Sequence, residues 1–306
     1  MNSIFIFPGQ GSQKIGMGKD FYDHTSLAKE MFEKASERVG FDFSSLLFED
    51  NERLDQTEFS QPAILLVSLI AHHLFKDQCK ALPKATLGHS LGEFSALSAS
   101  GAMDYLDAVA LVHHRGLLMK HACEGSNAGM MALLGLDDTR VEEITAKERE
   151  IGKKVWPANY NGDGQIVIAG NKEDLISLEP LFKEAGAKKT VLLSMSVASH
   201  CPLLSSAQPK LEEYLEQWLK ESFSTPVISN VTASSYQSKA DAKALLSQQL
   251  ISPVKYKQSI LQVESSVDCF IEFGGSVLKG LNKRITQKPT YSITDMKSLE
   301  EVLALL

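Results

Sequence analysis

The sequence predicts an α/β protein with a parallel β-sheet core and a small second unit inserted into it. Two observations lead to this prediction. Short apolar segments typical of buried parallel strands alternate with helical segments in the first and the last third of the chain. Between residues 125 and 194 the pattern changes to β-α-β-β-α-β. The 306 residues also correspond to two domains, at roughly 150 residues each.

The first third is expected to alternate strands and helices from its start. Ile4–Phe7 is an apolar run that ends at Pro-Gly, as a buried parallel strand does. The glycine-rich loop Gly9–Gln13 follows, but Lys14 and Gly16–Gly18 violate the dinucleotide-binding and phosphate-binding motifs. The further predicted elements are helices over Leu27–Val39, Pro62–Phe75 with Pro62 at its first position, Leu91–Ser100, and Tyr105–Cys123 capped by Asp104, and a strand over Ala85–Leu87.

Residues 125–194 contain a split β-α-β-β-α-β arrangement, which is the order of a ferredoxin-like module. Gly162–Gly164 supplies the turn between the two central strands, and Gly186 follows the last helix. The predicted elements are strand Met130–Leu134, helix Asp138–Glu150, strands Val155–Asn161 and Gln165–Ala169, helix Lys172–Ala185 and strand Lys189–Leu193.

After residue 195, helix and strand signals alternate again, which returns the chain to the parallel sheet. We therefore divide the chain into a larger part, 1–124 and 195–306, and an insert, 125–194. The alternating segments of the last third are Gln208–Glu221, Val227–Ser229, Ala242–Leu250, Val254–Val263, Cys269–Phe273, Val277–Arg284 and Leu299–Leu306.

The composition excludes several classes of protein. Hydrophobic residues make up 43% and charged residues 23%, as in ordinary globular proteins, so disorder, collagen and coiled coil are excluded. A net charge of −7 argues against a general nucleic-acid binder. The apolar run Ala63–Ala71 is about half the ~20 residues of a membrane span, and Ile4–Phe7 is too short for a signal peptide. The net charge and the short apolar runs thus predict neither a nucleic-acid nor a membrane partner. Widely spaced cysteines predict a reduced, cytoplasmic chain; they are Cys79, Cys123, Cys201 and Cys269.

The segment Gly88–Gly92 fits Gly-x-Ser-x-Gly, the nucleophile elbow. In this motif a sharp turn between a strand and a helix exposes the serine hydroxyl, and the next amide faces a developing oxyanion. A chance match of two glycines and a serine is the alternative. The predicted strand before and helix after Ser90 favour the functional interpretation.

A serine nucleophile needs a base, and the chain has eight histidines. His89 directly precedes Ser90, and neighbours on an extended turn point apart, so it is a poor candidate. His200 follows a strand and a run of small residues, which makes it the better candidate. The histidines form no metal-binding pattern, so no metal site is expected.

Several motifs occur together in a fixed order along the chain. On these motifs the sequence closely resembles the malonyl-CoA:acyl carrier protein transacylases of fatty-acid synthesis and the related acyltransferase domains of polyketide synthases. The resemblance implies an α/β-hydrolase-like catalytic subdomain, 1–124 and 195–306, and a ferredoxin-like small subdomain, 125–194. The motifs are Phe7–Gln13, Gly88–Glu93, Arg115-Gly116, Ser199-His200, Gln249-Leu250 with Pro253, and Gly280-Leu281 with Lys283-Arg284.

The resemblance also implies a role for each matching residue. Ser90 would be the nucleophile and His200 its base, oriented by the backbone carbonyl of Gln249 rather than by an acid. The activity implied is transfer of malonyl from malonyl-CoA to an acyl carrier protein through a serine ester, without a cofactor, because CoA is a substrate. The backbone amides of Gln10 and Leu91 would form the oxyanion hole, and Arg115 would bind the malonyl carboxylate.

Two other functions compete with this one. A serine hydrolase would need an acid between serine and histidine in chain order, and Asp163 and Asp174 lie there, although both fall in the insert. A non-catalytic module that binds acyl-CoA or a carrier protein is the second alternative. Ala198-Ser199 lies where related enzymes vary with the acyl group, so the choice between malonyl and methylmalonyl stays open, as does the choice of pathway.

An acidic carrier protein would need a local basic patch on this acidic chain. Lys188 and Lys189 open the last strand of the insert, and Lys283 and Arg284 end a late helix that also carries Lys279. The family resemblance implies that both segments flank the cleft between the subdomains, and we expect them to dock the carrier protein. Ordinary solubilising surface charge is the alternative for each of them.

Overall fold

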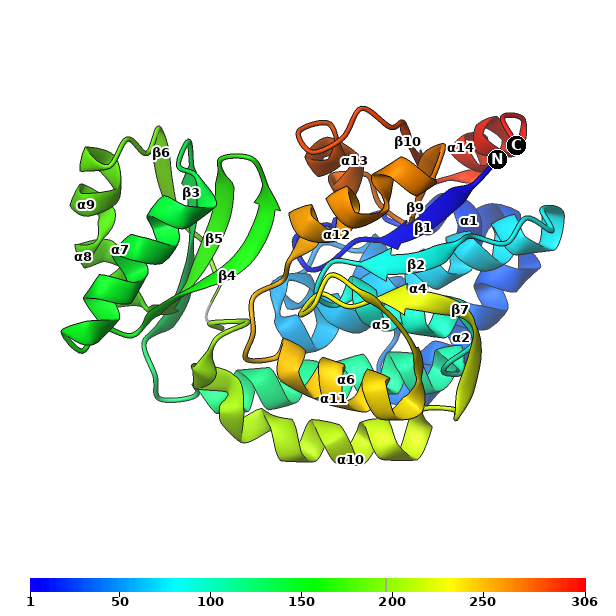
Figure 1. Ribbon diagram of the computed structural model, residues 1–306. Coiled ribbons are helices and arrows are strands. Elements are labelled where there is room, and N and C mark those ends of the chain that lie inside the picture. The colour runs from blue at the N-terminus through cyan, green and yellow to red at the C-terminus, as the bar shows by residue number, and fades with distance from the viewer. Residues whose placement is uncertain (196) are drawn as a thin grey trace.

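Two separate β-sheets organise the chain in the computed structural model, which describes residues 1–195 and 197–306 (Figure 1). The larger, sheet A, has the strand order β10-β9-β1-β2-β7-β8. Its first five strands are parallel neighbours, and β8 is antiparallel to β7 at the edge. The strands are β1 Ser3–Phe7, β2 Ala85–Gly88, β7 Ser222–Ile228, β8 Ser235–Ser238, β9 Cys269–Phe273 and β10 Thr290–Ile293.

The central strand β1 is apolar along its whole length because helices cover both faces of sheet A. Ile4 and Ile6 pack with residues of α12 and α13, whereas Phe5 and Phe7 pack with residues of α4. Helices α12 and α13 therefore form one layer, and α4 and α5 form the other, with α6 and α10 outside them (Figure 1).

The helices of this larger part are as follows. Three short 3₁₀ segments, Arg53–Asp55, Pro202–Ala207 and Glu264–Ser266, complete it. The α-helices are α1 Lys19–His24, α2 Ser26–Val39, α3 Phe43–Phe48, α4 Thr57–Gln78, α5 Gly92–Ala99, α6 Tyr105–Cys123, α10 Gln208–Trp218, α11 Lys239–Gln249, α12 Tyr256–Val263, α13 Val277–Asn282 and α14 Met296–Leu303.

Helix α4 begins at Thr57, so the prediction that Pro62 occupies its first position is wrong. Proline inside a helix leaves the carbonyl four residues earlier without its usual donor. Here that carbonyl belongs to Glu58, and it lies 2.8 Å from Nδ1 of His113 on α6. A side chain of the neighbouring helix thus replaces the missing backbone hydrogen bond and allows α4 to continue.

Other predictions also differ from the structure. The helix expected to end with Lys283 and Arg284 ends at Asn282, and the segment expected over Leu299–Leu306 is a helix over Met296–Leu303. The segment Gln208–Glu221 is too long as a helix, because the chain turns into β7 at Ser222. The helix expected over Lys172–Ala185 is divided at Leu178 into two, and the proline at position 180 lies in the first turn of the second. The sheet is also not wholly parallel, since β8 is a short polar edge strand with little apolar signal.

The smaller sheet B has the order β4-β5-β3-β6, with every neighbouring pair antiparallel. Its chain order, β3-α7-β4-β5-α8-α9-β6, follows the β-α-β-β-α-β order that the sequence predicts, with the second helix divided. Its helices cover the face away from sheet A (Figure 1). The elements are β3 Ala128–Leu134, α7 Asp138–Glu150, β4 Val155–Gly162, β5 Gln165–Asn171, α8 Lys172–Ser177, α9 Glu179–Glu184 and β6 Lys189–Leu192.

Sheet B is joined to the larger part by backbone pairing as well as by its two chain connections. Val254, just before α12, forms a parallel bridge with Asn159 of β4 and exchanges backbone hydrogen bonds with Ala158 and Tyr160. Lys257 of α12 adds an ion pair to Asp138 of α7 at 2.5 Å. Among the described helices, none combines the length and the apolar character that a membrane span requires.

Candidate active site

A sharp turn between β2 and α5 presents Ser90. This residue has a φ of 53°, a left-handed conformation that costs free energy for a residue with a side chain. A Cβ atom on Gly92 would lie 2.0 Å from the carbonyl oxygen of Phe7, and one on Gly88 would lie 1.8 Å from the backbone of Gly92. Both glycines are therefore required for the turn, which holds Ser90 at the N-terminus of α5.

His200 lies beside Ser90, although 110 residues separate them in the sequence. Its Nε2 is 2.7 Å from Oγ of Ser90, and its Nδ1 is 2.8 Å from the carbonyl oxygen of Gln249. Because a carbonyl oxygen only accepts, Nδ1 carries the proton and Nε2 presents its lone pair to the hydroxyl. The three groups expected to work together from the resemblance are thus in hydrogen-bond contact.

The surroundings of His200 keep its ring neutral. Burial and, to a smaller extent, the charge of Arg115 lower the pKa of His200 to about 3, although the bond to Gln249 opposes the shift. A neutral imidazole can accept the serine proton at every pH near neutrality. The arrangement is therefore that of a nucleophile with a base ready beside it.

The two acids considered for a serine-hydrolase triad lie elsewhere. Asp163 is at the turn between β4 and β5, is 82% exposed and pairs with Lys257. Asp174 lies in the first turn of α8, where it accepts from the backbone N–H of Lys154 at 2.9 Å. Neither acid reaches His200, whose Nδ1 is occupied by a carbonyl oxygen.

The amides predicted for the oxyanion hole border the same cavity. Gln10 follows β1 and Leu91 follows Ser90, and both line the cavity into which Ser90 opens. In the part of the chain that the structure describes, neither amide donates a hydrogen bond to another protein group. Two unpaired N–H groups beside a serine hydroxyl can stabilise an oxyanion.

Arg115 of α6 also lines this cavity. It is 2% exposed, and its guanidinium donates to Oε1 of Gln61 at 2.6 Å and to Oε1 of Gln249 at 3.1 Å. One of its nitrogens lies 3.4 Å from Oγ of Ser90. Burial lowers the pKa of Arg115 to about 10, so it remains a cation at neutral pH.

No carboxylate within the described residues forms an ion pair with Arg115, and its Nε is buried without a partner. A buried cation of this kind normally has an anionic partner. The guanidinium of Arg115 can therefore still donate hydrogen bonds to an anionic group of a bound ligand.

The cavity itself has a volume of about 200 Å³ and lies between the two sheets. Ser90 comes from the turn after β2 and Arg115 from α6, whereas His200 comes from the segment that returns from sheet B. Strands of sheet B and the residues after β6 supply a largely apolar wall. The residues that line it are Gln10, His89, Ser90, Leu91, Arg115, Met119, Met130, Asn159, Asn161, Val167, Leu193, Met195, Ser199 and His200.

Comparison with known proteins gives the family. Residues 4–298 match the acyl transferase domain. The malonyl CoA-acyl carrier protein transacylase of Bacillus subtilis (strain 168) is 41% identical over 300 residues, which cover 97% of this chain and 94% of that protein. The chain belongs to this transacylase family.

Solved structures of the family have the same fold. The malonyl-CoA:acyl carrier protein transacylase of Helicobacter pylori is 48% identical, with a TM-score of 0.97 over 100% of this chain and 98% of the other. A malonyl-transacylase in complex with its type II PKS acyl-carrier protein is 34% identical, with a TM-score of 0.96 over 100% of both chains.

In this member of the transacylase family, the structure adds site residues that the sequence analysis does not identify. Asn230 lies two residues beyond β7, and its Oδ1 accepts from the backbone N–H of Ser90 at 2.7 Å. Gln61 of α4 holds the guanidinium of Arg115. Of these two residues, only Asn230 has a sequence feature that could have indicated it. It follows a predicted parallel strand, and polar residues in that position gather at one edge of the sheet.

His89 connects the two sheets and not the reacting groups. Its Nε2 lies 2.7 Å from Oδ1 of Asn161 on β4, and burial lowers the pKa of His89. The expectation that His89 is a poor general base agrees with this contact. His89 therefore contributes to the attachment of sheet B above the cavity.

The four basic residues predicted to dock a carrier protein are all exposed. Lys189 pairs with Leu134 across sheet B, and Leu134 pairs with Gln165, whose side chain accepts from Arg284 at 3.0 Å. Lys188 and Lys283 are the chain neighbours of the two ends of this row. The basic residues of the two segments thus lie along one end of sheet B, where it meets the segment after α13.

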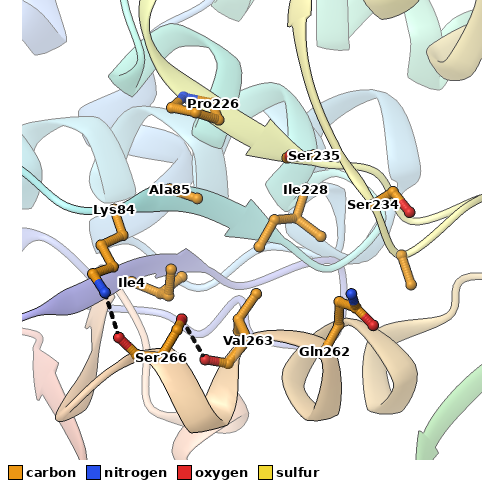
Figure 2. A pocket seen from close by; sticks show the side chains of 11 residues that line it. Ile4, Lys84, Ala85, Pro226, Ile228, Ser234, Ser235, Gln262, Val263 and Ser266 are labelled. Carbon is orange, nitrogen blue, oxygen red and sulfur yellow. Dashed lines mark hydrogen bonds between the residues drawn. The ribbon is translucent and has the colours of Figure 1, made fainter.

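A separate cavity of about 320 Å³ lies between sheet A and helix α12 (Figure 2). Ile4, Ala85 and Ile228 form its apolar floor, and Lys84 donates to the carbonyl oxygen of Ser266 at 2.6 Å. None of the site residues predicted from the sequence is among those that line it. The chemistry of the chain therefore gathers in the cavity between the sheets.

Proposed function

We propose that this chain transfers a malonyl group from malonyl-CoA to the phosphopantetheine thiol of an acyl carrier protein, through an ester on Ser90. Membership of the transacylase family supports the reaction, and the complex of a related malonyl-transacylase with its acyl-carrier protein supports the partner. No cofactor is needed, because the thioester of the donor substrate already carries the activated acyl group.

One observation carries the choice of acyl group. Arg115 is buried, lacks a carboxylate partner among the described residues, and lies 3.4 Å from Oγ of Ser90. The free carboxylate of a malonyl group attached to Ser90 would supply the missing anion in a bidentate pair. A simple lipase or thioesterase substrate has no group that uses this cation.

In the first half-reaction, Ser90 Oγ attacks the thioester carbon and His200 Nε2 takes the hydroxyl proton. The carbonyl oxygen becomes an oxyanion, which the amides of Gln10 and Leu91 stabilise. One such donor contributes about 3–4 kcal/mol. Collapse of the intermediate breaks the carbon–sulfur bond, and the departing CoA sulfur takes the proton from His200.

In the second half-reaction, the carrier thiol enters after CoA leaves. His200 accepts its proton, the sulfur attacks the ester carbon, and Ser90 leaves with the proton returned by His200. A second cavity of about 360 Å³ shares Gln10 and Met195 with the first and gives space for the arm that carries the thiol. Because CoA leaves before the carrier thiol reacts with the acyl ester on Ser90, the mechanism is ping-pong.

The remaining assignments belong to the same proposal. We assign residues 1–124 and 195–306 to an α/β-hydrolase-like catalytic subdomain and residues 125–194 to a ferredoxin-like small subdomain, which the separate sheets A and B support. The chain is assigned to the cytoplasm and to fatty-acid biosynthesis. The assignment to fatty-acid biosynthesis would be contradicted if a carrier protein of polyketide synthesis accepted malonyl much faster than a carrier protein of fatty-acid synthesis does.

We assign carrier docking to Lys188, Lys189, Lys283 and Arg284. They are exposed and lie along the end of sheet B that contacts the segment after α13. Acidic carrier proteins would be attracted by this local charge although the whole chain has a net charge of −7.

The proposed function is tested by the intact mass of the protein after incubation with malonyl-, methylmalonyl- and acetyl-CoA. We expect the mass of one malonyl group to be added in preference to the others. Ser90→Ala should abolish this addition and leave the fold intact, and His200→Ala should slow it strongly for lack of a base. Addition of a malonyl group to the Ser90→Ala variant would show that another residue is the nucleophile.

A further inference from the structure

Glu93 is a buried carboxylate behind the turn of Ser90. It is the second residue of α5, is 0% exposed, and does not line the cavity. Its oxygens accept hydrogen bonds from the backbone N–H of Asn230 at 3.0 Å, the hydroxyl of Tyr236 at 3.0 Å and Nε2 of Gln249 at 2.7 Å. Two of these three donors belong to residues that contact the reacting groups.

The first of them, Asn230, clamps the turn on both sides of the nucleophile. Its Oδ1 accepts from the N–H of Ser90 at 2.7 Å, and its Nδ2 donates to the carbonyl of Gly88 at 2.6 Å. These bonds extend the pairing of β2 with β7 beyond the last paired residue, Ile228. Glu93 fixes the backbone that carries this amide.

The second, Gln249, lies between two charged groups. Its Nε2 donates to Glu93 and also to the carbonyl of Ser90 at 3.1 Å, while its Oε1 accepts from Arg115 at 3.1 Å. Its main-chain carbonyl accepts from His200. A flipped side-chain amide would oppose like partial charges at both ends, so the carboxylate selects the orientation that serves Arg115.

The same amide keeps the carboxylate and the guanidinium apart. Burial raises the pKa of Glu93 to about 7, even though the hydrogen bonds from Asn230, Gln249 and Tyr236 and the charge of Arg115 oppose the rise. A direct ion pair would occupy the guanidinium. With Gln249 inserted, Arg115 is oriented by the carboxylate and still has N–H groups for a substrate anion.

We propose that Glu93 is a positioning residue for acyl transfer. Through Asn230 it holds the turn that presents the nucleophile, and through Gln249 it orients the base and the Arg115 guanidinium. The inference rests on the proposed function, because the reaction it serves is acylation of the serine by a carboxylated acyl group.

The test is Glu93→Gln, which preserves size and removes the charge. A carboxamide can still accept from the N–H groups of Asn230 and Gln249 through its oxygen, and its NH₂ group can donate to the hydroxyl of Tyr236. The variant therefore tests the charge and not the number of hydrogen bonds. We expect the single-turnover acylation rates with malonyl-CoA and acetyl-CoA to fall about tenfold, because neutral hydrogen bonds replace the stronger charge-assisted ones that hold Asn230 and Gln249. The ratio of the malonyl rate to the acetyl rate should fall further, by about threefold, because Arg115 loses its orientation.

Glu272 provides a matched control. It is also 0% exposed, and it also accepts three hydrogen bonds, from the backbone N–H groups of Leu278 and Lys279 and from the hydroxyl of Ser292. None of its partners contacts the reacting groups. Glu272→Gln should therefore leave both acylation rates and their ratio unchanged, even if it lowers the unfolding temperature as much as Glu93→Gln does.

The outcomes separate this inference from the proposed function. If the wild-type chain forms no malonyl ester, the proposed function fails. If it does, and folded Glu93→Gln retains the wild-type rates and ratio, or Glu93→Gln and Glu272→Gln change them equally, only the positioning role is overturned.

A second variant covers the case in which Glu93→Gln does not fold. Gln249→Met retains the main-chain carbonyl that accepts from His200 and removes the amide that joins Glu93 to Arg115. It should lower the rate and the ratio in the same way. If Glu93→Gln does fold, combining the two substitutions should add little to either single loss. Wild-type kinetics in Gln249→Met, or fully multiplicative losses in the double variant, would overturn the proposal.

Discussion

Arg115 is the residue whose surroundings differ most from what its type normally requires. It is almost fully buried and is held by two neutral glutamine side chains, Gln61 and Gln249, with no carboxylate paired to it among the described residues. Desolvation of a charge is costly unless an opposite charge compensates it. The negative charge of Glu93, which lies beyond Gln249, partly compensates the cation, and the malonyl carboxylate of the proposed function would supply a direct partner.

Arg115→Ala should convert the preference for malonyl into a preference for uncharged acyl groups. Loss of a buried charge pair costs about 2–5 kcal/mol, which is enough to reverse a selectivity. The measurement is the ratio of acylation rates with malonyl-CoA and acetyl-CoA. Arg38→Ala is the control, because Arg38 is an exposed arginine that pairs with Asp107 away from the cavity. An unaltered ratio in Arg115→Ala would mean that the arginine has only a structural role.

For single residues, the sequence indicates functional side chains better than functional backbone atoms. The position of Ser90 follows from glycine spacing, since its two glycines are needed for the close approach of β1, β2 and α5. The partnership with His200 depends on a contact across 110 residues, which spacing does not reveal. Gln249 acts on His200 through a carbonyl that every residue possesses, so only the family resemblance indicates it.

Helix α4 illustrates how one element depends on its neighbours. Its middle is buried on all sides, and His72 packs there against Phe5, Phe7 and Phe273. Burial lowers the pKa of His72 to about 3, with smaller contributions from His73 and Lys76 in the same direction. A histidine that cannot take up a proton in the folded state makes stability depend on pH.

The sign of this dependence is defined by where the proton binds. Above about pH 6.5 neither state of the protein protonates His72, and between about pH 6.5 and 3 only the unfolded state does. The free energy of unfolding therefore falls as pH falls through this range. His72→Phe removes the effect, so its stability relative to wild type should improve by about 1.4 kcal/mol between pH 7.5 and pH 5.5.

Urea denaturation of both proteins at the two pH values measures this difference. His72→Leu separates the proton from the packing, because it also removes the titrating group but loses the aromatic contacts. The two variants should share the pH-dependent change and differ in the part that does not vary with pH. A stability difference between wild type and His72→Phe that is the same at both pH values would contradict the assignment.

At the scale of elements, prediction is most accurate where local signals are strong. Helix α6 begins and ends where the sequence predicts, because Asp104 caps it by accepting from the N–H of Leu106 at 3.0 Å. Helix α4 extends beyond its prediction because a side chain of α6 compensates for Pro62, which is a tertiary contact. The edge strands β8 and β10 are four residues long, and β8 is mostly polar, so their strand signal is weak.

For the whole molecule, the architecture brings basic residues from two distant segments to one end of sheet B. Replacing Lys189 and Arg284 with glutamate reverses the charge there and should raise the apparent KM for the carrier protein. The rise should be larger at low salt, because the attraction is electrostatic and screened by ions. Acylation by malonyl-CoA should change little. The two half-reactions are measured separately, at low and at physiological ionic strength.

Lys80→Glu with Lys297→Glu is the matched control, since it alters the net charge equally at exposed positions away from sheet B. It should affect the carrier half-reaction much less. Equal losses in both double variants, or equal losses in both half-reactions, would show that total charge or general damage is responsible, and not a docking surface.

The division of the chain into two patterns is the part of the architecture that the sequence predicts well. The change of periodicity near residues 125 and 194 reflects a real difference, because strands of sheet A are covered on both faces whereas those of sheet B alternate between two environments. How the two sheets meet depends on Val254, His89 and Asn161, whose contacts carry no local signal.

The separation of the cavity lining between the two sheets has a consequence for how such a protein can change. Met130, Val167 and Leu193 form the apolar wall and lie within one continuous stretch of about 65 residues, whereas Ser90 and His200 lie outside it. Substitutions in that stretch can alter the size of the acyl group that fits without moving the atoms that react. The size of the acyl group that fits and the reacting atoms are thus encoded in different stretches of the chain, whereas selection by charge through Arg115 stays with the reacting atoms.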